Sequence, residues 1–368
     1  MEPYLHRNFG NPSSSHFFGT PCKAAVELAR QRVADLVAAS PQEIYFTSCG
    51  TESDNWAIWG AVMAARQRQP GGPPPHVVTS FIEHPAVLEA LQAWQQLGLL
   101  KYTAVPVDGQ GLVDPADVAA AVTPHTALVT IMHSNNEVGS LQPIREIAQL
   151  ARDRGVLVHS DAAQSIGKVP VDVKKLGVDM LTIVGHKFGA PKGVAALYVR
   201  HSVHIAKFLH GGGQERGKRA GTENVLLLAG LGKAAEIAQE ELQETSRHMA
   251  AMRDRLKQQL RSRLPQGMVR INGPTNTGQQ LPNTLSISLR GISASGLLGQ
   301  LSSQLAASAG AACHSHGGPS ISAVLAAMQV PEEFAVGTLR LSCGRHTTAA
   351  EVNRAVDLIV GYVQAQGA

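Results

Sequence analysis

Short β-rich runs alternate with helical patterns through most of this chain, and this alternation constrains the fold more than any other sequence feature. The runs EIYFTS, HVVTS, LVTIM, GVLVHSD, MLTIV and VAALYVR have the length and composition of buried strands. Helical patterns lie between most of them; the first is predicted to begin at Thr20, as a capping residue, with Pro21 at its first position. The alternation predicts an α/β fold with a mostly parallel, helix-covered sheet.

The pattern changes after the glycines at 211–213. A long amphipathic stretch follows from about residue 224 to about residue 263, and the remainder reads as a smaller α+β unit with the strands TLSISL and TLRLS and a closing helix. We therefore predict two domains: a large domain over residues 1–235 and a small carboxyl-terminal domain over residues 236–368.

Composition excludes several classes of protein. Of the 368 residues, 44% are hydrophobic, which is enough for a sizeable core, and 32 basic against 28 acidic residues give a net charge of only +4. Because there is no basic run with interleaved aromatics, nucleic-acid binding is not expected. The four cysteines fit a reducing compartment rather than a disulfide scaffold. No apolar run reaches the 18 or so residues of a membrane span, and the first residues have no signal core, so we predict a cytoplasmic protein. An organellar location is the alternative if an N-terminal segment is missing from this sequence.

Two strand ends carry residues with catalytic potential. Lys187 follows the strand MLTIV among glycines and small residues, where desolvation can turn a lysine into an amine nucleophile. Asp161 ends the preceding strand, a position from which a carboxylate can keep the ring nitrogen of pyridoxal phosphate protonated. The plainer alternatives are a surface lysine in a Gly/Pro loop and an aspartate that caps the next helix.

Two loops carry further candidates. Thr47–Glu52 joins a strand to a helix, and its glycine, hydroxyls and backbone amides can cradle a phosphate or form an ordinary capping turn. Cys313 stands in the small-residue segment SAGAACHSHGG, where a flanking histidine can lower the pKa of the thiol. A zinc site at Cys313, His314 and His316 is a weak competitor, because no second cysteine stands at ligand spacing, and no metal is predicted.

Taken in order, the segments EHPAV, SNNEVG, HSDAAQ, GHKFGAPKG, GGGQERGKRAGTEN, SAGAACHS and LRLSCGRHTT resemble the cysteine desulfurase and selenocysteine lyase group. This group comprises class V aminotransferase-family enzymes that use pyridoxal 5'-phosphate and have the aspartate-aminotransferase-like fold (fold type I). The resemblance implies that residues 1–235 bind the cofactor and that residues 236–368 carry the catalytic cysteine loop.

The resemblance assigns roles around the cofactor ring. Lys187 would hold the cofactor as a Schiff base and move the substrate's α-proton. Asp161 would pair with the pyridine nitrogen, Gln164 would hydrogen-bond the phenolic oxygen, and His84 would stack on the ring and assist proton transfer. Asn136 would line both the cofactor and the substrate.

The remaining implied roles concern the phosphate and the substrate. Arg340 would fork onto the substrate carboxylate, and Cys313 would attack its sulfur or selenium, leaving alanine and an enzyme-bound persulfide or perselenide. Because one phosphate ligand would come from a neighbouring subunit, the resemblance implies a homodimer. The phosphate would be held by Gly50, Thr51, His186 and the partner subunit's Thr222.

Two departures from the group bear on function. The group's usual first strand and loop, about 20 residues before NPSS, have no counterpart here, which leaves a catalytically impaired scaffold as an alternative. Val184 stands where desulfurases usually have serine, and with the AACHS segment it leans the prediction toward selenocysteine lyase. The alternative is a cysteine desulfurase that passes sulfur to an acceptor protein for Fe–S clusters or thiolated cofactors. A zinc-binding regulatory protein is a remote fourth.

Overall fold

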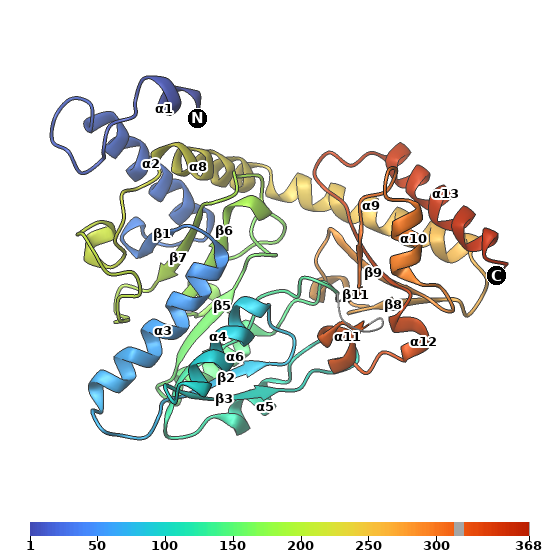
Figure 1. Ribbon diagram of the computed structural model, residues 1–368, viewed down its shortest axis with the longest axis horizontal. Helices are drawn as coiled ribbons and strands as arrows, with labels where there is room; N and C mark the ends of the chain where they lie inside the picture. The colour runs from blue at the N-terminus through green and yellow to red at the C-terminus, as the bar shows by residue number, and fades with distance from the viewer. Residues whose placement is uncertain (313–319, 368) are drawn as a thin grey trace. The chain divides into compact units, whose positions relative to one another are not determined.

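The computed structural model describes residues 1–312 and 320–367 (Figure 1). The chain divides into two compact units, and each contains segments that are not continuous in sequence. The first unit comprises Met1–Val105, Asp114–Ser134 and Pro143–Leu242, and the second comprises Pro106–Val113, Asn135–Gln142 and Gln243–Ala368.

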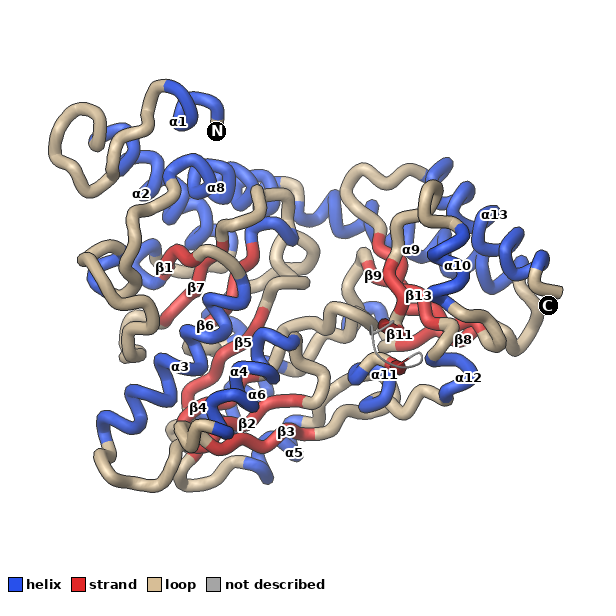
Figure 2. The backbone as a smooth tube through the Cα atoms, in the orientation of Figure 1, coloured by secondary structure: helices blue, strands red, loops and turns tan. Residues whose placement is uncertain are grey.

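The first unit is built on a seven-stranded sheet in the order β1-β7-β6-β5-β4-β2-β3 (Figure 2). The neighbours from β6 to β3 are parallel, whereas β7 runs antiparallel to both β6 and β1. The predicted mostly parallel α/β sheet is therefore confirmed. The strands are β1 (Ile44–Thr47), β2 (His76–Ser80), β3 (Lys101–Val105), β4 (Thr126–Thr130), β5 (Leu157–Asp161), β6 (Met180–Val184) and β7 (Ala195–Val199).

Helices connect these strands and bury their apolar faces against the sheet. Trp56 and Ile58 of α3 pack in one core with Leu128, Met180 and Leu197 of the strands. The helices of this unit are α1 (Glu2–His6), α2 (Thr20–Leu36), α3 (Gly50–Arg68), α4 (Pro85–Gln96), α5 (Pro115–Ala121), α6 (Ile144–Arg152), α7 (Val173–Leu176) and α8 (Val225–Glu240), with the 3-10 turns η1 (Pro41–Glu43), η2 (Gly185–Lys187) and η3 (Glu215–Gly217).

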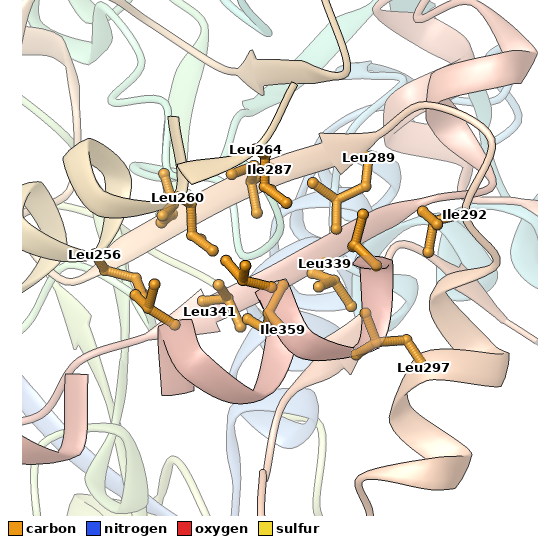
Figure 3. Close-up of a cluster of buried hydrophobic side chains, with 14 of the residues drawn as sticks. Leu256, Leu260, Leu264, Ile287, Leu289, Ile292, Leu297, Leu339, Leu341 and Ile359 are labelled. Carbon is orange, nitrogen blue, oxygen red and sulfur yellow. The ribbon is translucent and has the colours of Figure 1, made fainter. Parts of the chain in front are cut away.

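The second unit has a four-stranded antiparallel sheet in the order β10-β13-β9-β8. Leucine, isoleucine and valine side chains from β9, β13 and three helices form its core, as Figure 3 shows around Ile287, Leu339 and Ile359. The elements are α9 (Leu242–Arg263), β8 (Val269–Asn272), η4 (Thr277–Gln279), β9 (Thr284–Leu289), α10 (Ala294–Gln300), β10 (Ser308–Ala309), β11 (Ala311–Ala312), β12 (Ser320–Ile321), α11 (Ala323–Ala327), α12 (Glu332–Ala335), β13 (Thr338–Ser342) and α13 (Ala349–Ala365).

Three details differ from the sequence-based expectations. The stretch from residue 224 to residue 263 forms two helices, α8 and α9, rather than one. Gly19 is the N-cap of α2, so Thr20 lies inside the helix, where its hydroxyl donates to the carbonyl of His16. The short edge strand β3 was not expected. Its residues alternate between exposed and half-buried, and only one of them is buried, so it lacks the continuous buried run by which the other strands were recognised.

The division between the units also differs from the predicted boundary at residue 235. It lies between Leu242 and Gln243, where α8 has ended and α9 begins. Two connections of the first sheet, Pro106–Val113 and Asn135–Gln142, belong to the second unit, since the amide of Leu141, for example, donates to the carbonyl of Gln279. Such pairing depends on residues distant in sequence, so composition did not reveal it. Within the described residues, no helix is long and apolar enough to cross a membrane.

Candidate active site

Three of the predicted site residues lie together at the carboxyl ends of the parallel strands. Asp161 is the last residue of β5, Lys187 ends η2 directly after the neighbouring β6, and His84 follows β2 as the N-cap of α4. The positive charges of His84 and Lys187 both act on the Asp161 carboxylate. This edge is where ligands bind in open α/β sheets.

Asp161 is the most enclosed member of this group, with 6% of its surface exposed. Its Oδ1 accepts a hydrogen bond of 2.8 Å from the amide of Ala163. Burial raises the pKa of Asp161, while the Ala163 amide and the charges on His84 and Lys187 oppose that rise. A pyridinium nitrogen facing this carboxylate would add one more favourable charge.

The other side chains at this edge are more accessible. Lys187 and His84 are exposed, so the chain alone does not desolvate the lysine as its glycine-rich surroundings suggested. His84 Nδ1 accepts from the amide of Ala86 at 3.1 Å, which leaves the ring proton on Nε2 in the neutral form. Gln164 is half-buried three residues beyond Asp161.

A buried lysine that sequence reasoning missed lies behind this group. Lys168 Nζ donates to the carbonyl of Gln164 at 2.8 Å. Burial, together with the charge of Lys187, lowers the pKa of Lys168 to about 8. The preceding Gly167 has φ of +73°, and a Cβ there would lie 2.8 Å from Cβ of Phe188, so the loop after β5 packs closely beside Lys187. No local pattern distinguishes Lys168 from a solvated lysine.

The predicted phosphate cradle lies at the amino terminus of α3. Gly50 and Thr51 are its first residues, and the first amides of a helix have no partner within the helix and favour an anion. A Cβ on Gly50 would come within 2.6 Å of Cγ2 of Val184, so the helix start is held against the end of β6. His186 is exposed beside it, and partial burial with the charges of Lys187 and Lys192 lowers its pKa.

A half-buried ion pair joins the GGGQERGKRAGTEN segment to this turn. Arg219 donates from Nε and Nη2 to the two carboxylate oxygens of Glu52, at 2.8 and 3.0 Å. Burial raises the pKa of Glu52, but hydrogen bonds from Arg219 and Ser48 outweigh it and lower the pKa overall. Thr222 is exposed three residues beyond Arg219. Arg219 was not among the residues predicted from the sequence, although an arginine in a glycine-rich motif is a recognisable signal.

The second unit holds the predicted substrate-binding residues. Arg340 on β13 donates from Nη1 to the carbonyl of Asn136 at 2.9 Å and from Nη2 to Oγ of Ser308 at 3.0 Å. Beside them Glu137 accepts a 2.6 Å bond from the hydroxyl of Ser322. Burial raises the pKa of Glu137, and Ser322 and Arg340 oppose that rise. The structure thus brings Arg340 and Asn136 into direct contact.

The predicted nucleophile Cys313 lies outside the described residues, as do His314 and His316 of the zinc alternative. Residues 1–312 and 320–367 contain no group of three or more histidine, cysteine or acidic side chains that could hold a metal ion. The other cysteines of this part are free, with Cys22 and Cys343 buried and Cys49 half-buried.

The first unit fits pyridoxal phosphate in each of its three needs: an amine at Lys187, a buried carboxylate at Asp161 for the ring nitrogen, and the start of α3 for the phosphate. The fold and this site define a pyridoxal-phosphate-dependent enzyme. The model of the "Aminotransferase class-V" family matches residues 1–355. The chain belongs to the class-V aminotransferase family.

Individual relatives agree with this assignment. The chain is 44% identical over 366 residues to "Cysteine desulfurase IscS" of Methanosarcina thermophila, covering 99% of this chain and 87% of the relative. It is 41% identical over 360 residues to the protein of that name from Clostridium botulinum strain Hall, covering 98% and 88%. A solved structure described as a "NIFS-LIKE PROTEIN" superimposes with a TM-score of 0.89 at 37% identity, covering 99% and 94%. The predicted family, fold type and cofactor are thereby confirmed.

Proposed function

We propose that this chain is a cysteine desulfurase, which converts L-cysteine to L-alanine and leaves the sulfur as a persulfide on Cys313. The observation that carries the proposal is the group formed by Lys187, Asp161 and His84 at the strand ends, in a chain that matches proteins named cysteine desulfurase over nearly its whole length. A solved relative titled "SspA in complex with cysteine", 31% identical with a TM-score of 0.79, supports cysteine as the substrate.

Side chains of the first unit would move the substrate's α-proton and stabilise the charge on the cofactor ring. Bound pyridoxal phosphate supplies an electron sink that makes the amino acid's α-proton acidic. Lys187 Nζ takes this proton and returns it, and His84, with its ring proton on Nε2, assists the transfer. Asp161 provides the negative charge that keeps the pyridine nitrogen protonated, and Gln164 hydrogen-bonds the phenolic oxygen.

The phosphate would be held by the amides of Gly50 and Thr51 and by His186. We also propose a homodimer in which the exposed Thr222 reaches the phosphate of the neighbouring subunit. The Arg219–Glu52 ion pair supports this role, because it anchors the segment that carries Thr222. Sedimentation showing a fully active monomer of 38.9 kDa would contradict the dimer.

The second unit would bind the substrate's carboxylate and receive its sulfur. Among the described residues, each terminal nitrogen of Arg340 uses one N–H, so a second N–H on each remains for a two-pronged bond to a carboxylate. Asn136 lies beside this guanidinium. The Cys313 thiolate attacks the sulfur: an S–S bond forms, the Cβ–S bond breaks, and Cβ gains a proton to give alanine, so no external oxidant is needed.

The names of the relatives favour cysteine over the selenocysteine lyase reading that Val184 and the AACHS segment suggested. Sulfur would then pass from Cys313 to an acceptor protein. We propose a cytoplasmic location on the sequence grounds given above, and cell fractionation tests it.

The proposed function is tested by measuring alanine from L-cysteine and from L-selenocysteine, side by side, with the purified chain loaded with pyridoxal phosphate. We expect a visible absorption band from the bound cofactor, alanine from cysteine, and a persulfide on Cys313. Alanine from selenocysteine alone would overturn the proposal in favour of a lyase. A chain with no visible band would instead be an impaired scaffold.

A further inference from the structure

A second carboxyl group lies buried under the site, and the mechanism above does not use it. Asp54 stands on α3, four residues beyond Gly50, with 2% of its surface exposed. Its Oδ1 has no hydrogen-bond partner among the described residues, and the nearest basic atom, Nε2 of His159, is 3.7 Å away. A buried carboxyl oxygen without a partner is costly, and the cost is far greater if the group is charged.

The Asp54 carboxyl lies at the end of a row of polar side chains from three neighbouring strands. Thr182 on β6 hydrogen-bonds the Asp54 carboxyl, and its Oγ1 lies 3.0 Å from Nε2 of His159 on β5. His159 Nδ1 lies 2.9 Å from Oγ1 of Thr130 on β4. Because His159 and Asp161 alternate along β5, they share one face of the sheet. The row therefore runs beside the carboxylate proposed for the pyridine nitrogen.

The charges around the two aspartates differ. Lys187 and His84 both lie beside Asp161 and favour its negative charge. The groups that act on Asp54 are Asp161, Glu83 and Cys49, all of which oppose a negative charge there. His159 cannot compensate, because burial lowers its pKa to about 3 and keeps the ring neutral.

Burial and the Asp161 charge therefore raise the pKa of Asp54 well above its ordinary value of 3.8, and the hydrogen bond from Thr182 offsets this only in part. Two carboxyl groups that interact in a buried site cannot both ionise readily, so the one without cations keeps the proton. Asp54 is that group.

We propose that Asp54 is a positioning residue for Asp161: its buried carboxyl stays protonated at the end of the Thr182–His159–Thr130 row, so that Asp161 alone carries the negative charge toward the pyridine nitrogen. This inference rests on the cofactor-binding part of the proposed function, in which Asp161 faces the ring. It does not depend on which amino acid is the substrate.

The first test measures the free energy of unfolding of the cofactor-free chain as a function of pH, in the wild type and in Asp54→Asn. A carboxamide has the shape of a protonated acid but cannot ionise. If the pKa of Asp54 is higher in the folded than in the unfolded chain, protonated Asp54 contributes stability that is fully present below about pH 4. This contribution is lost as pH rises toward the pKa of Asp54 in the folded chain. The contributions of titratable groups that do not interact with Asp54 cancel in the comparison, and the variant should gain stability relative to the wild type as pH rises from 4 to 8.

The result that would overturn the proposal is a difference that is constant with pH, or one in which Asp54→Asn becomes less stable as pH rises, since either shows an ionised Asp54. Thr182→Val is the matched variant: it nearly keeps the side chain's shape but removes the hydrogen bond to Asp54. Its loss of stability should continue to higher pH than in the wild type, because Thr182 lowers the pKa of Asp54.

The second test compares the dissociation constants of pyridoxal phosphate, measured by its visible absorption, for Asp54→Asn and Asp161→Asn. The loss of affinity should be at least about tenfold larger for Asp161→Asn, because only that change removes the charge. Equal losses would overturn the proposal. Failure to make alanine from cysteine, with both results as expected, would count against the desulfurase function and leave the Asp54 inference standing.

Discussion

The functional residues of the two units are held in place by different means. In the first unit, Asp161 ends a strand and Lys187 follows the next one, so the hydrogen-bond ladder between β5 and β6 sets their backbone positions. In the second unit, Asn136 lies in a connection and meets Arg340 through a side chain's hydrogen bond to a carbonyl. A sheet edge provides fixed positions for chemistry, whereas the Arg340 cluster depends on individual side-chain bonds.

This difference implies two kinds of variant. Changes in the first unit's site remove groups on which the cofactor's chemistry depends, so their effects should be all-or-none. Changes in the second unit's carboxylate-binding cluster should be graded and should appear in substrate affinity. The following predictions on activity run from the largest expected effect to the smallest, and a prediction on stability follows them.

Replacing Lys187 by alanine should abolish turnover. The rate of alanine formation should fall by several orders of magnitude or more, as is typical when a covalent catalytic group is removed. Alanine release and the visible band of the cofactor are the measurements. Lys192→Ala is the matched control, because Lys192 is an exposed lysine of the same loop. The assignment of Lys187 is wrong if its variant keeps both the band and near-normal alanine release.

Replacing Cys313 by alanine should eliminate alanine formation from cysteine but leave measurable formation from selenocysteine. A selenol is ionised at neutral pH and leaves readily, whereas a free thiol, with a pKa of about 8.5, is mostly protonated and its sulfur needs a nucleophile. Cys313 would then be the one proposed residue of the second unit whose replacement abolishes activity toward cysteine instead of reducing it by degrees. Unchanged turnover of cysteine would show that Cys313 is only a small loop residue.

Replacing Arg340 by lysine should raise KM by about tenfold or more and leave the affinity for pyridoxal phosphate unaltered. Lysine is a point charge and cannot reproduce the guanidinium's two-pronged bond to a carboxylate. Arg290→Lys, at an exposed ion pair with Glu333 in the same unit, provides the control. If kcat falls while KM stays the same, Arg340 acts on the chemistry and the comparison between the two units breaks down.

The last prediction concerns the stability of the first unit rather than its activity, and it depends on the buried His133. Burial lowers the pKa of His133 to about 4, and its Nδ1 lies 2.7 Å from Oγ of Ser165. Because the folded pKa is below the ordinary 6.5, the unfolded chain binds more protons as pH falls, so the stabilising contribution is present above pH 6.5 and is lost toward pH 4.

The loss assigned to His133 is about 3 kcal/mol. It is measured by urea unfolding of the wild type and of His133→Gln at pH 7 and pH 4. Tryptophan fluorescence follows the first unit, because all three tryptophans, Trp56, Trp59 and Trp94, belong to it. The stability advantage of the wild type should shrink toward pH 4; an advantage that does not change with pH would mean that His133 titrates normally.

Much of the fold followed from local pattern. The run MLTIV predicted β6 over its full length, and HVVTS did the same for β2, because a buried parallel strand has a continuous apolar or β-branched sequence. The antiparallel direction of β7 was not predictable in this way, since a strand's sequence does not encode its neighbour's direction.

The sequence by itself determined the chemistry-bearing positions that follow strands, because Asp161 and Lys187 come directly after recognisable buried runs and parallel strands end at one edge. Only the tertiary structure decided the roles of Asp54, Lys168 and Arg219. Each is a polar residue whose local pattern fits a solvated helix or loop. Asp54 and Arg219 interact with residues distant in the chain, and the loop that carries the buried Lys168 packs against Phe188. Burial of a charge is a property of what packs around it, and that packing has no local signature.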